Sequence, residues 1–166
     1  MKVGIISDIH DNFVNLEKFL SWAKKNKIKE LIMCGDLCAP ATLFEVLAPG
    51  FQGKIHMVFG NVCDRDIESE KAKEAGHVIH YGDLGKFKID EKRIAIIHYP
   101  FEAKKLAESK KYDFVFYGHS HEPWIEKVGE TYLVNPGTLA GMFNKASFAV
   151  WDTKINKLDL KILELL

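Results

Sequence analysis

Seven side chains that can coordinate a metal ion lie just past five apolar stretches of the sequence that are typical of β-strands. These side chains are Asp8, His10, Asp36, Asn61, His98, His119 and His121. Buried strands have no chemical reason to end five times on Asp, Asn or His, whereas a shared polar site gives one. In open α/β sheets, ligands bind outside the carboxyl ends of the strands. The pattern therefore predicts that these residues meet at one sheet edge and hold two metal ions.

The pieces of this pattern differ in how specific they are. A lone Asp-x-His, Gly-Asp or Gly-Asn is weak evidence, because such pairs are more often turns than ligands. His98 taken alone fits a core histidine as well as a ligand. The segment 118–121 (GHSH) is the most specific, because a structural role does not readily explain two imidazoles two residues apart after a strand. A purely structural explanation of all five pieces would need five unrelated coincidences, so we expect a metal site.

Strands and helices alternate in the first half of the chain and would position the first ligands. This order is the signature of parallel βαβ units. Asn12 is expected to cap the helix that follows His10, because an Asn side chain satisfies free N–H groups at a helix start. Residues 66–75 and 101–110 predict two further helices, and a hairpin is predicted around Asp90.

The second half of the chain changes to closely spaced strands. The segments 123–128, 131–135, 147–152 and 157–162 predict a second, mostly antiparallel sheet. Two sheets packed face to face with helices outside predict an α/β fold, a four-layer α/β/β/α sandwich of two mixed sheets flanked by helices. With neither a repeat nor a linker in sight, we expect a single domain over residues 1–166.

Composition narrows the classes of function. Lys+Arg and Asp+Glu both number 23, so there is no net positive charge to attract a long nucleic acid. No apolar run has the length of a transmembrane helix and no signal peptide is visible, so we expect a cytoplasmic protein without membrane contacts. The three cysteines contain no CxxC pair, which argues against a zinc ribbon. The apolar C-terminal run predicts a core strand, with an edge contact in a homo-oligomer as the alternative.

The set DIH, GD, GN, H and GHSH, in this order, resembles the calcineurin-like metallophosphoesterases, and among them the small, single-domain phosphodiesterases of prokaryotes. The match extends from Val3 to about Val150 and includes the segment 135–138, which in the family lies behind the site. The resemblance implies two divalent transition-metal ions, with Mn²⁺ expected first and Fe, Zn²⁺ or Ni²⁺ as alternatives. A mixed nitrogen and oxygen ligand set also favours these metals over Ca²⁺ or Mg²⁺.

The resemblance also implies how the ligands are shared. One ion would be held by Asp8, His10 and His121. The other would be held by Asn61, His98 and His119. Asp36 would bridge the two. After both carboxylates and a bridging hydroxide are counted, two divalent ions leave a net positive charge that favours an anionic phosphate ester.

The implied function is a binuclear metal-dependent phosphodiesterase that hydrolyses small phosphodiesters or nucleotides. The nucleophile would be the hydroxide, because metal coordination lowers the pKa of water to about 7. One alternative is a non-catalytic scaffold that uses this fold to bind protein partners; such scaffolds tend to lose histidines that are all present here. The other alternative is a phosphomonoesterase, which would differ in the shape of its pocket.

One segment departs from the family pattern. Asn61 is followed by Val62, where many members have a His that is thought to protonate the leaving group, so no general acid is assigned. Esters with poor leaving groups should therefore react slowly, since such protonation contributes about 10²–10⁴-fold. Asn12 and Asp64 are expected to support the ligands from behind. Tyr99 follows His98 where the family usually has Gly, which predicts a differently shaped pocket.

Overall fold

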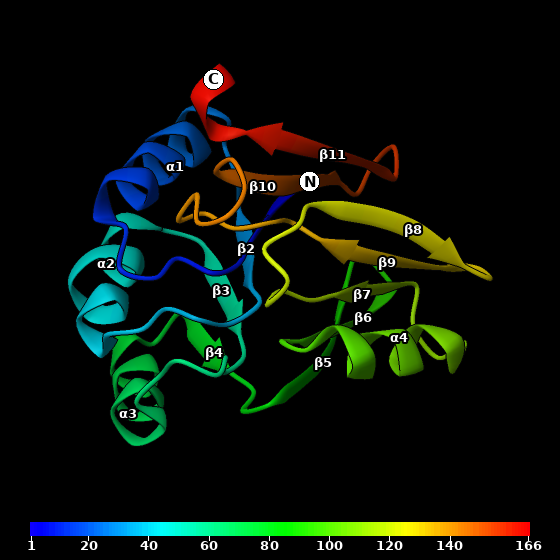
Figure 1. Ribbon diagram of the computed structural model, residues 1–166, viewed down its shortest axis with the longest axis horizontal. Coiled ribbons are helices and arrows are strands. Elements are labelled where there is room, and N and C mark those ends of the chain that lie inside the picture. Colours follow the sequence, from blue (N-terminus) through cyan, green and yellow to red (C-terminus); the bar gives the residue numbers. More distant parts are fainter.

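The computed structural model describes all residues from 1 to 166, with two β-sheets stacked face to face at its centre (Figure 1). The first sheet has the strand order β11-β10-β1-β2-β3-β4. Its strands are β1 (Lys2–Ile6), β2 (Glu30–Met33), β3 (Lys54–Met57), β4 (Val78–His80), β10 (Ser147–Asp152) and β11 (Lys157–Ile162). The second sheet has the order β5-β6-β7-β9-β8. Its strands are β5 (Leu84–Ile89), β6 (Lys92–Ile97), β7 (Phe114–Phe116), β8 (Trp124–Val128) and β9 (Thr131–Asn135).

The last two strands join a different sheet from the one that the sequence predicts. β10 pairs antiparallel with β1, with Ala149 opposite Ile5, and β11 continues this sheet as its edge. The second sheet is also less antiparallel than expected, because β7 runs parallel to both β6 and β9. Five of the six residues of β10 are buried, as suits a strand next to the central β1 and covered on both faces. Both sheets are mixed, as predicted.

Helices cover the outer faces of both sheets. α1 (Phe13–Lys25), the π-helix η1 (Thr42–Leu47), its continuation α2 (Ala48–Gly50) and α3 (Arg65–Ala75) lie on the side of the first sheet, and α4 (Pro100–Glu108) lies against the second (Figure 1). The chain ends in the short 3-10 helix η2 (Leu163–Leu165). Asn15 N–H donates to Asn12 Oδ1 at 3.1 Å, which confirms the predicted cap of α1. None of these helices combines the length and the apolar character that crossing a membrane requires.

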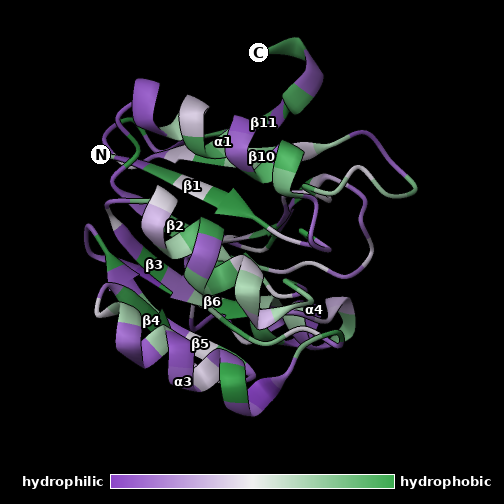
Figure 2. Ribbon diagram, turned by 90° about the vertical axis from the view of Figure 1, so that its left-hand side faces the viewer, coloured by the Kyte–Doolittle hydropathy of each residue, from purple (hydrophilic) through white to green (hydrophobic).

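Apolar side chains fill the three spaces between these four layers. Phe19 of α1 and Phe148 of β10 belong to the cluster between the first sheet and its helices. Ile5 and Trp151 belong to the cluster between the two sheets. Ala103 of α4 belongs to a third cluster on the outer face of the second sheet. Figure 2 shows the matching distribution of hydropathy: strands such as β1 are predominantly hydrophobic, and the helices in front of them carry both polar and apolar residues.

A row of hydrogen-bonded polar side chains, centred on His56, lies beside the apolar cluster between the two sheets. His56 of β3 is 4% exposed, its Nε2 lies 3.1 Å from Glu30 Oε2, and its Nδ1 lies 2.9 Å from the Tyr81 hydroxyl. The ring stacks on Phe87 with 4.1 Å between centroids. Burial lowers the pKa of His56 to about 4 and raises the pKa of Tyr81 to about 12. Neutral His56 therefore donates from Nε2 to Glu30 and accepts from Tyr81 at neutral pH.

Candidate metal centre

The predicted ligands lie at the carboxyl ends of five strands that come from both sheets. β1, β2 and β3 are parallel neighbours in the first sheet, and β6 and β7 are parallel neighbours in the second. Backbone hydrogen bonds tie the loops beyond these strands together. Asp8 N–H donates to Gly35 O at 3.0 Å, and Gly118 N–H donates to His98 O at 3.1 Å. The shared edge brings all seven side chains into one cluster.

Asp8, His10 and His121 form the first group of this cluster. His121 Nε2 lies 3.2 Å from Asp8 Oδ1 and 3.3 Å from His10 Nε2, and His10 Nε2 lies 3.8 Å from Asp8 Oδ1. Donor atoms that share one ion at about 2.1 Å are about 3.0–3.4 Å apart, so two of the three spacings fit a common ion and the third, between His10 and Asp8, is slightly longer. The Asp8 side chain is fully buried, yet its Oδ1 accepts no hydrogen bond. A buried carboxylate oxygen without a partner is costly, so the group fits a cation placed among its three donors.

Asn61, His98 and His119 form the second group. Asn61 Oδ1 lies 2.9 Å from His98 Nε2 and 2.8 Å from His119 Nδ1. Asp36 connects the two groups, because its Oδ2 lies 3.5 Å from His98 Nε2 and 3.7 Å from His10 Nε2. The cluster thus holds two carboxylates, one amide oxygen and four imidazoles. Such a mixed donor set suits transition metals, whereas Ca²⁺ and Mg²⁺ prefer oxygen throughout.

Three of the imidazole rings are fixed through their second nitrogen. His98 Nδ1 lies 2.8 Å from Cys34 O, and His10 Nδ1 lies 3.2 Å from Cys38 Sγ. His121 Nδ1 lies 3.3 Å from Met142 O. Contacts of this kind set the orientation of ligand histidines and are a common feature of metal sites. They leave the Nε2 atoms directed into the cluster.

Five of the seven candidate ligands have left-handed backbone conformations. Their φ angles are 53° for Asp8, 43° for His10, 58° for Asp36, 68° for His119 and 59° for His121. A positive φ is uncommon in residues other than glycine, and such strain gathers at functional sites. The sharp turns fold each side chain back over its strand end, so short loops can present their ligands to one point.

The loops can approach this closely because glycines precede three of the candidate ligands, and two of these glycines show how tight the approach is. A Cβ on Gly60 would overlap both the carboxylate and the backbone nitrogen of Asp36. A Cβ on Gly118 would overlap Ser7 Oγ and would lie 2.8 Å from Asp8 Oδ2. Any side chain at either position would separate the strand ends.

The charges in the cluster favour the ionised form of Asp36. Burial by itself would raise the pKa of Asp36, but hydrogen bonds from His98 and from Val62 N–H outweigh this effect, and the pKa is lowered. Burial likewise opposes charge on His98, but neighbouring Asp36 and Asp8 raise its pKa. The Asp8 carboxylate raises the pKa of His10. The result is a buried, electron-rich cluster that attracts cations.

The structure gives other roles to Asn12 and Asp64 than direct support of the ligands. Asn12 caps α1 and donates to Ala140 O at 2.9 Å. Asp64 is exposed and caps α3 by accepting from Ile67 N–H at 3.1 Å. Support from behind comes instead from Thr138, whose hydroxyl donates to Asp8 O at 3.0 Å, and from Asn135, which donates to Gly118 O at 3.0 Å. The segment 135–138 therefore lies where the sequence resemblance implies.

Comparison with known proteins gives consistent matches over nearly the whole chain. The model of the calcineurin-like phosphoesterase superfamily domain matches residues 1–156. A protein named Phosphodiesterase MJ0936, from Methanocaldococcus jannaschii, is 30% identical over 85% of this chain and 86% of its own length. Phosphodiesterase YfcE from Escherichia coli K12 is 25% identical over 93% of this chain and 89% of its own length.

Solved structures agree with these sequence matches. A structure described as a novel archaeal phosphodiesterase superposes with a TM-score of 0.90 at 26% identity, covering 98% of this chain and 99% of that one. Vps29 from Entamoeba histolytica in complex with zinc superposes with a TM-score of 0.70 at 18% identity, covering 98% and 99%. At that identity the likeness shows a shared fold alone.

Proposed function

This chain belongs to the calcineurin-like phosphoesterase superfamily, and from that premise we propose that it is a phosphodiesterase that depends on two bound transition-metal ions. The observation that carries the proposal is the meeting of metal-coordinating side chains from five strand ends around Asp8, whose Oδ1 accepts no hydrogen bond. The substrates would be small phosphodiesters or nucleotides, and Mn²⁺ is the first choice of metal.

We assign the ligands in two sets that share Asp36. Asp8, His10 and His121 would hold one ion, because their donor atoms lie 3.2–3.8 Å apart. Asn61, His98 and His119 would hold the other, because the amide oxygen of Asn61 is within 2.9 Å of a nitrogen of each histidine. Asp36 would contact both ions, since its Oδ2 lies between a histidine of each set.

The protein would contribute ligands that are already in position, and the bound ions would contribute positive charge. When bound, the two ions would supply the positive charge that holds a phosphate group and would lower the pKa of water to give a nucleophile near neutral pH. His10, His98 and His121 are held by their Nδ1 contacts, so little reorganisation is needed. Val62 follows Asn61, and its side chain has no acidic proton to give to a leaving group. Esters with good leaving groups should therefore react fastest.

A non-catalytic scaffold is the alternative that the Vps29 fold suggests. The four histidines of the cluster are all present here, and both carboxylates are buried among them. This arrangement favours catalysis. A phosphomonoesterase would use the same metal centre, and only a comparison of substrates separates it from a diesterase.

The test combines metal content with hydrolysis in one preparation. Protein stripped with a chelator and reloaded with Mn²⁺ should bind two ions and hydrolyse bis(p-nitrophenyl) phosphate faster than p-nitrophenyl phosphate. Asp36→Ala should abolish hydrolysis. Asp159→Ala, which removes a half-buried carboxylate that pairs with Lys157 on the edge strand β11, should leave it unchanged. Two bound ions without turnover of any ester would support the scaffold, and faster hydrolysis of the monoester would support a phosphomonoesterase.

A further inference from the structure

Large apolar side chains are exposed around the metal centre, where a purely ionic site would not need them. Val62 follows Asn61 and is 42% exposed, and Tyr99 follows His98 and is 41% exposed. Met142, whose carbonyl oxygen contacts His121, is 42% exposed, and the neighbouring Phe143 is 89% exposed. Single exposed apolar residues are ordinary, but four of them next to candidate ligands point to a binding surface.

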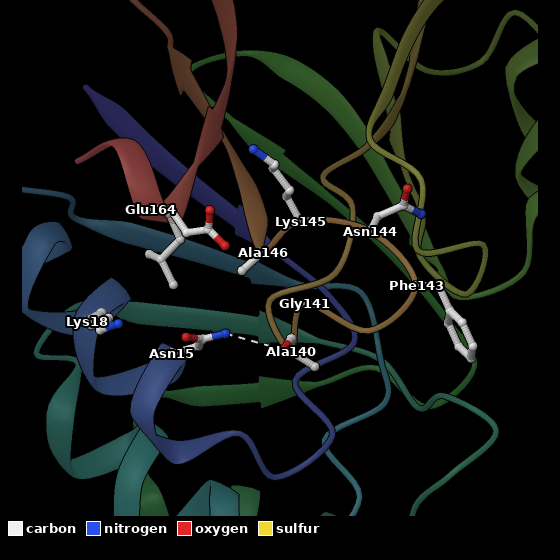
Figure 3. Close-up of a pocket in the computed structure, with 10 residues that line it drawn as sticks. Asn15, Lys18, Ala140, Gly141, Phe143, Asn144, Lys145, Ala146 and Glu164 are labelled. Carbon is white, nitrogen blue, oxygen red and sulfur yellow. Dashed lines mark hydrogen bonds between the residues drawn. The ribbon is translucent and has the colours of Figure 1, made fainter.

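The backbone of Phe143 is strained in the conformation that exposes its side chain. Its φ angle is 64°, a conformation that is strained for a bulky side chain. The loop is tied on both sides of Phe143, because Asn15 donates to Leu139 O at 2.9 Å and Asn144 donates to His121 O at 3.1 Å. The loop also borders a cavity of about 730 Å³, but Figure 3 shows the Phe143 ring pointing away from Asn15 and Glu164 on the other wall. The ring lies instead 5.4 Å from the ring of His121.

Tyr99 has the matching position on the other half of the cluster. Its ring centroid lies 5.2 Å from that of His98 and 5.1 Å from that of His119, both at edge-to-face angles. One aromatic ring thus stands beside each of the two ligand groups. A phosphodiester carries one negative charge and two organic substituents, so a phosphate held by the metals would direct its substituents outward past these rings.

We propose that Phe143 and Tyr99 are specificity-determining residues that select phosphodiesters with aromatic substituents, such as nucleosides or aryl groups. The inference rests on the proposed function and adds the class of substrate. Aromatic rings interact favourably at centroid distances of 4.5–7 Å, and any base or aryl group offers a face for stacking. We call the exposed apolar residues Val62, Tyr99, Met142 and Phe143 the apolar rim of the site.

The test uses two diesters with the same leaving group. Thymidine 5′-(p-nitrophenyl) phosphate and methyl p-nitrophenyl phosphate differ only in the substituent that stays on phosphorus. The ratio of their kcat/KM values therefore measures how strongly the protein prefers thymidine to methyl at that position. The wild-type protein should prefer the thymidine ester. The double variant Phe143→Gly/Tyr99→Leu should lose this preference by about 5- to 20-fold, near the lower end of measured base stacking. The single variants then show which ring contacts the thymidine, and Ile155→Ala, an exposed apolar residue on the β10–β11 turn, is the control.

The outcomes separate this inference from the proposed function. A double variant with the wild-type ratio, or a wild-type protein that hydrolyses both esters equally well, would overturn the inference and leave the phosphodiesterase standing. Failure to hydrolyse either ester with both metals bound would overturn both, and would point to a protein partner for this rim. Phe143→Gly should not lower Tm, since glycine relieves the strained φ. A lowered Tm together with lost selectivity would mean that the ring only holds the loop.

Discussion

Replacing Asp8 by Asn should stabilise the metal-free protein and remove the stabilisation that the ion held by Asp8 would give. The Asp8 side chain is fully buried, its Oδ2 accepts from His119 N–H at 3.1 Å, and its Oδ1 accepts no hydrogen bond. Asn would place its oxygen at the Oδ2 position to keep the bond from His119. Its NH₂ group would then occupy the Oδ1 position, 3.2 Å from His121 Nε2, and could donate to that ring.

The size of the effect follows from this exchange. An unsatisfied buried polar group costs about 1–3 kcal/mol, so the metal-free variant should gain about that much at a pH where His10 and His98 are neutral and lose no charge interaction with Asp8. In a domain of this length 1 kcal/mol changes Tm by about 2–4 °C, which gives a rise of about 2–12 °C. With Mn²⁺ at a hundred times its Kd, the wild-type protein should gain about 2.7 kcal/mol from the ion that Asp8 holds. The variant should gain none from that ion, because its NH₂ group points at the metal position.

Thermal unfolding followed by circular dichroism, in a chelator and across a series of Mn²⁺ concentrations, measures both halves of this prediction. Asp159→Asn makes the same chemical change at the exposed edge strand and should shift stability by no more than about 0.5 kcal/mol. If Asp8→Asn lowers Tm in the chelator, the free Oδ1 is not a source of instability. If the variant keeps the full Mn²⁺-dependent rise, Asp8 does not hold an ion.

Three further predictions follow from the same structure. His121→Ala should reduce bound metal from two ions to one by elemental analysis, and unchanged stoichiometry would place His121 outside the ligand set. Gly60→Ala should abolish metal binding and strongly lower the free energy of unfolding in urea, because the new Cβ would overlap Asp36. Gly129→Ala strains a φ of 61° but has no atom within 4 Å of its Cβ, so it should cost far less. The free energy of unfolding should fall as pH drops from about 6.5 to about 4. His56 has its ordinary pKa in the unfolded chain and a pKa of about 4 in the folded protein, so the unfolded chain binds the proton first as pH falls. This loss should reach about 3 kcal/mol, reduced by any stabilisation that protonated His56 gains from pairing with Glu30. If His56→Phe, measured with a chelator present, shows the same dependence of unfolding free energy on pH, the prediction is wrong.

The sequence predicts the strand ends well because the signal is local. An apolar run followed at once by Asp, Asn or His marks both the strand and the side chain that leaves its edge, and the structure brings all seven of these residues together. Their division between two ions stays a proposal. The attachment of β10 to β1 was not predictable in this way, because Ala149 and Ile5 are far apart in the chain and nothing local specifies their pairing.

The contacts around the ligands were also hidden from the sequence, for physical reasons. Cys34 and Met142 contact histidines of the candidate ligand set through backbone carbonyl oxygens, which every residue has. The left-handed φ angles occur at Asp and His residues, whereas a sequence suggests a left-handed φ mainly where it has a glycine. Asn12 and Asp64 lie near the ligands in sequence, but each serves as a helix cap, a role that short polar residues take up wherever a helix begins.

The pairing of β1 with β10 has a consequence for the protein during its synthesis. β1 lacks one of its two neighbours until residues 147–152 have been made, and at about 5–20 residues per second this takes roughly 7–30 s after Lys2. Asp8 and His10, which extend from β1, are therefore the first candidate ligands to be translated and among the last to be fixed in place. A nascent chain on the ribosome should thus carry every ligand by residue 121 and still have no finished metal centre.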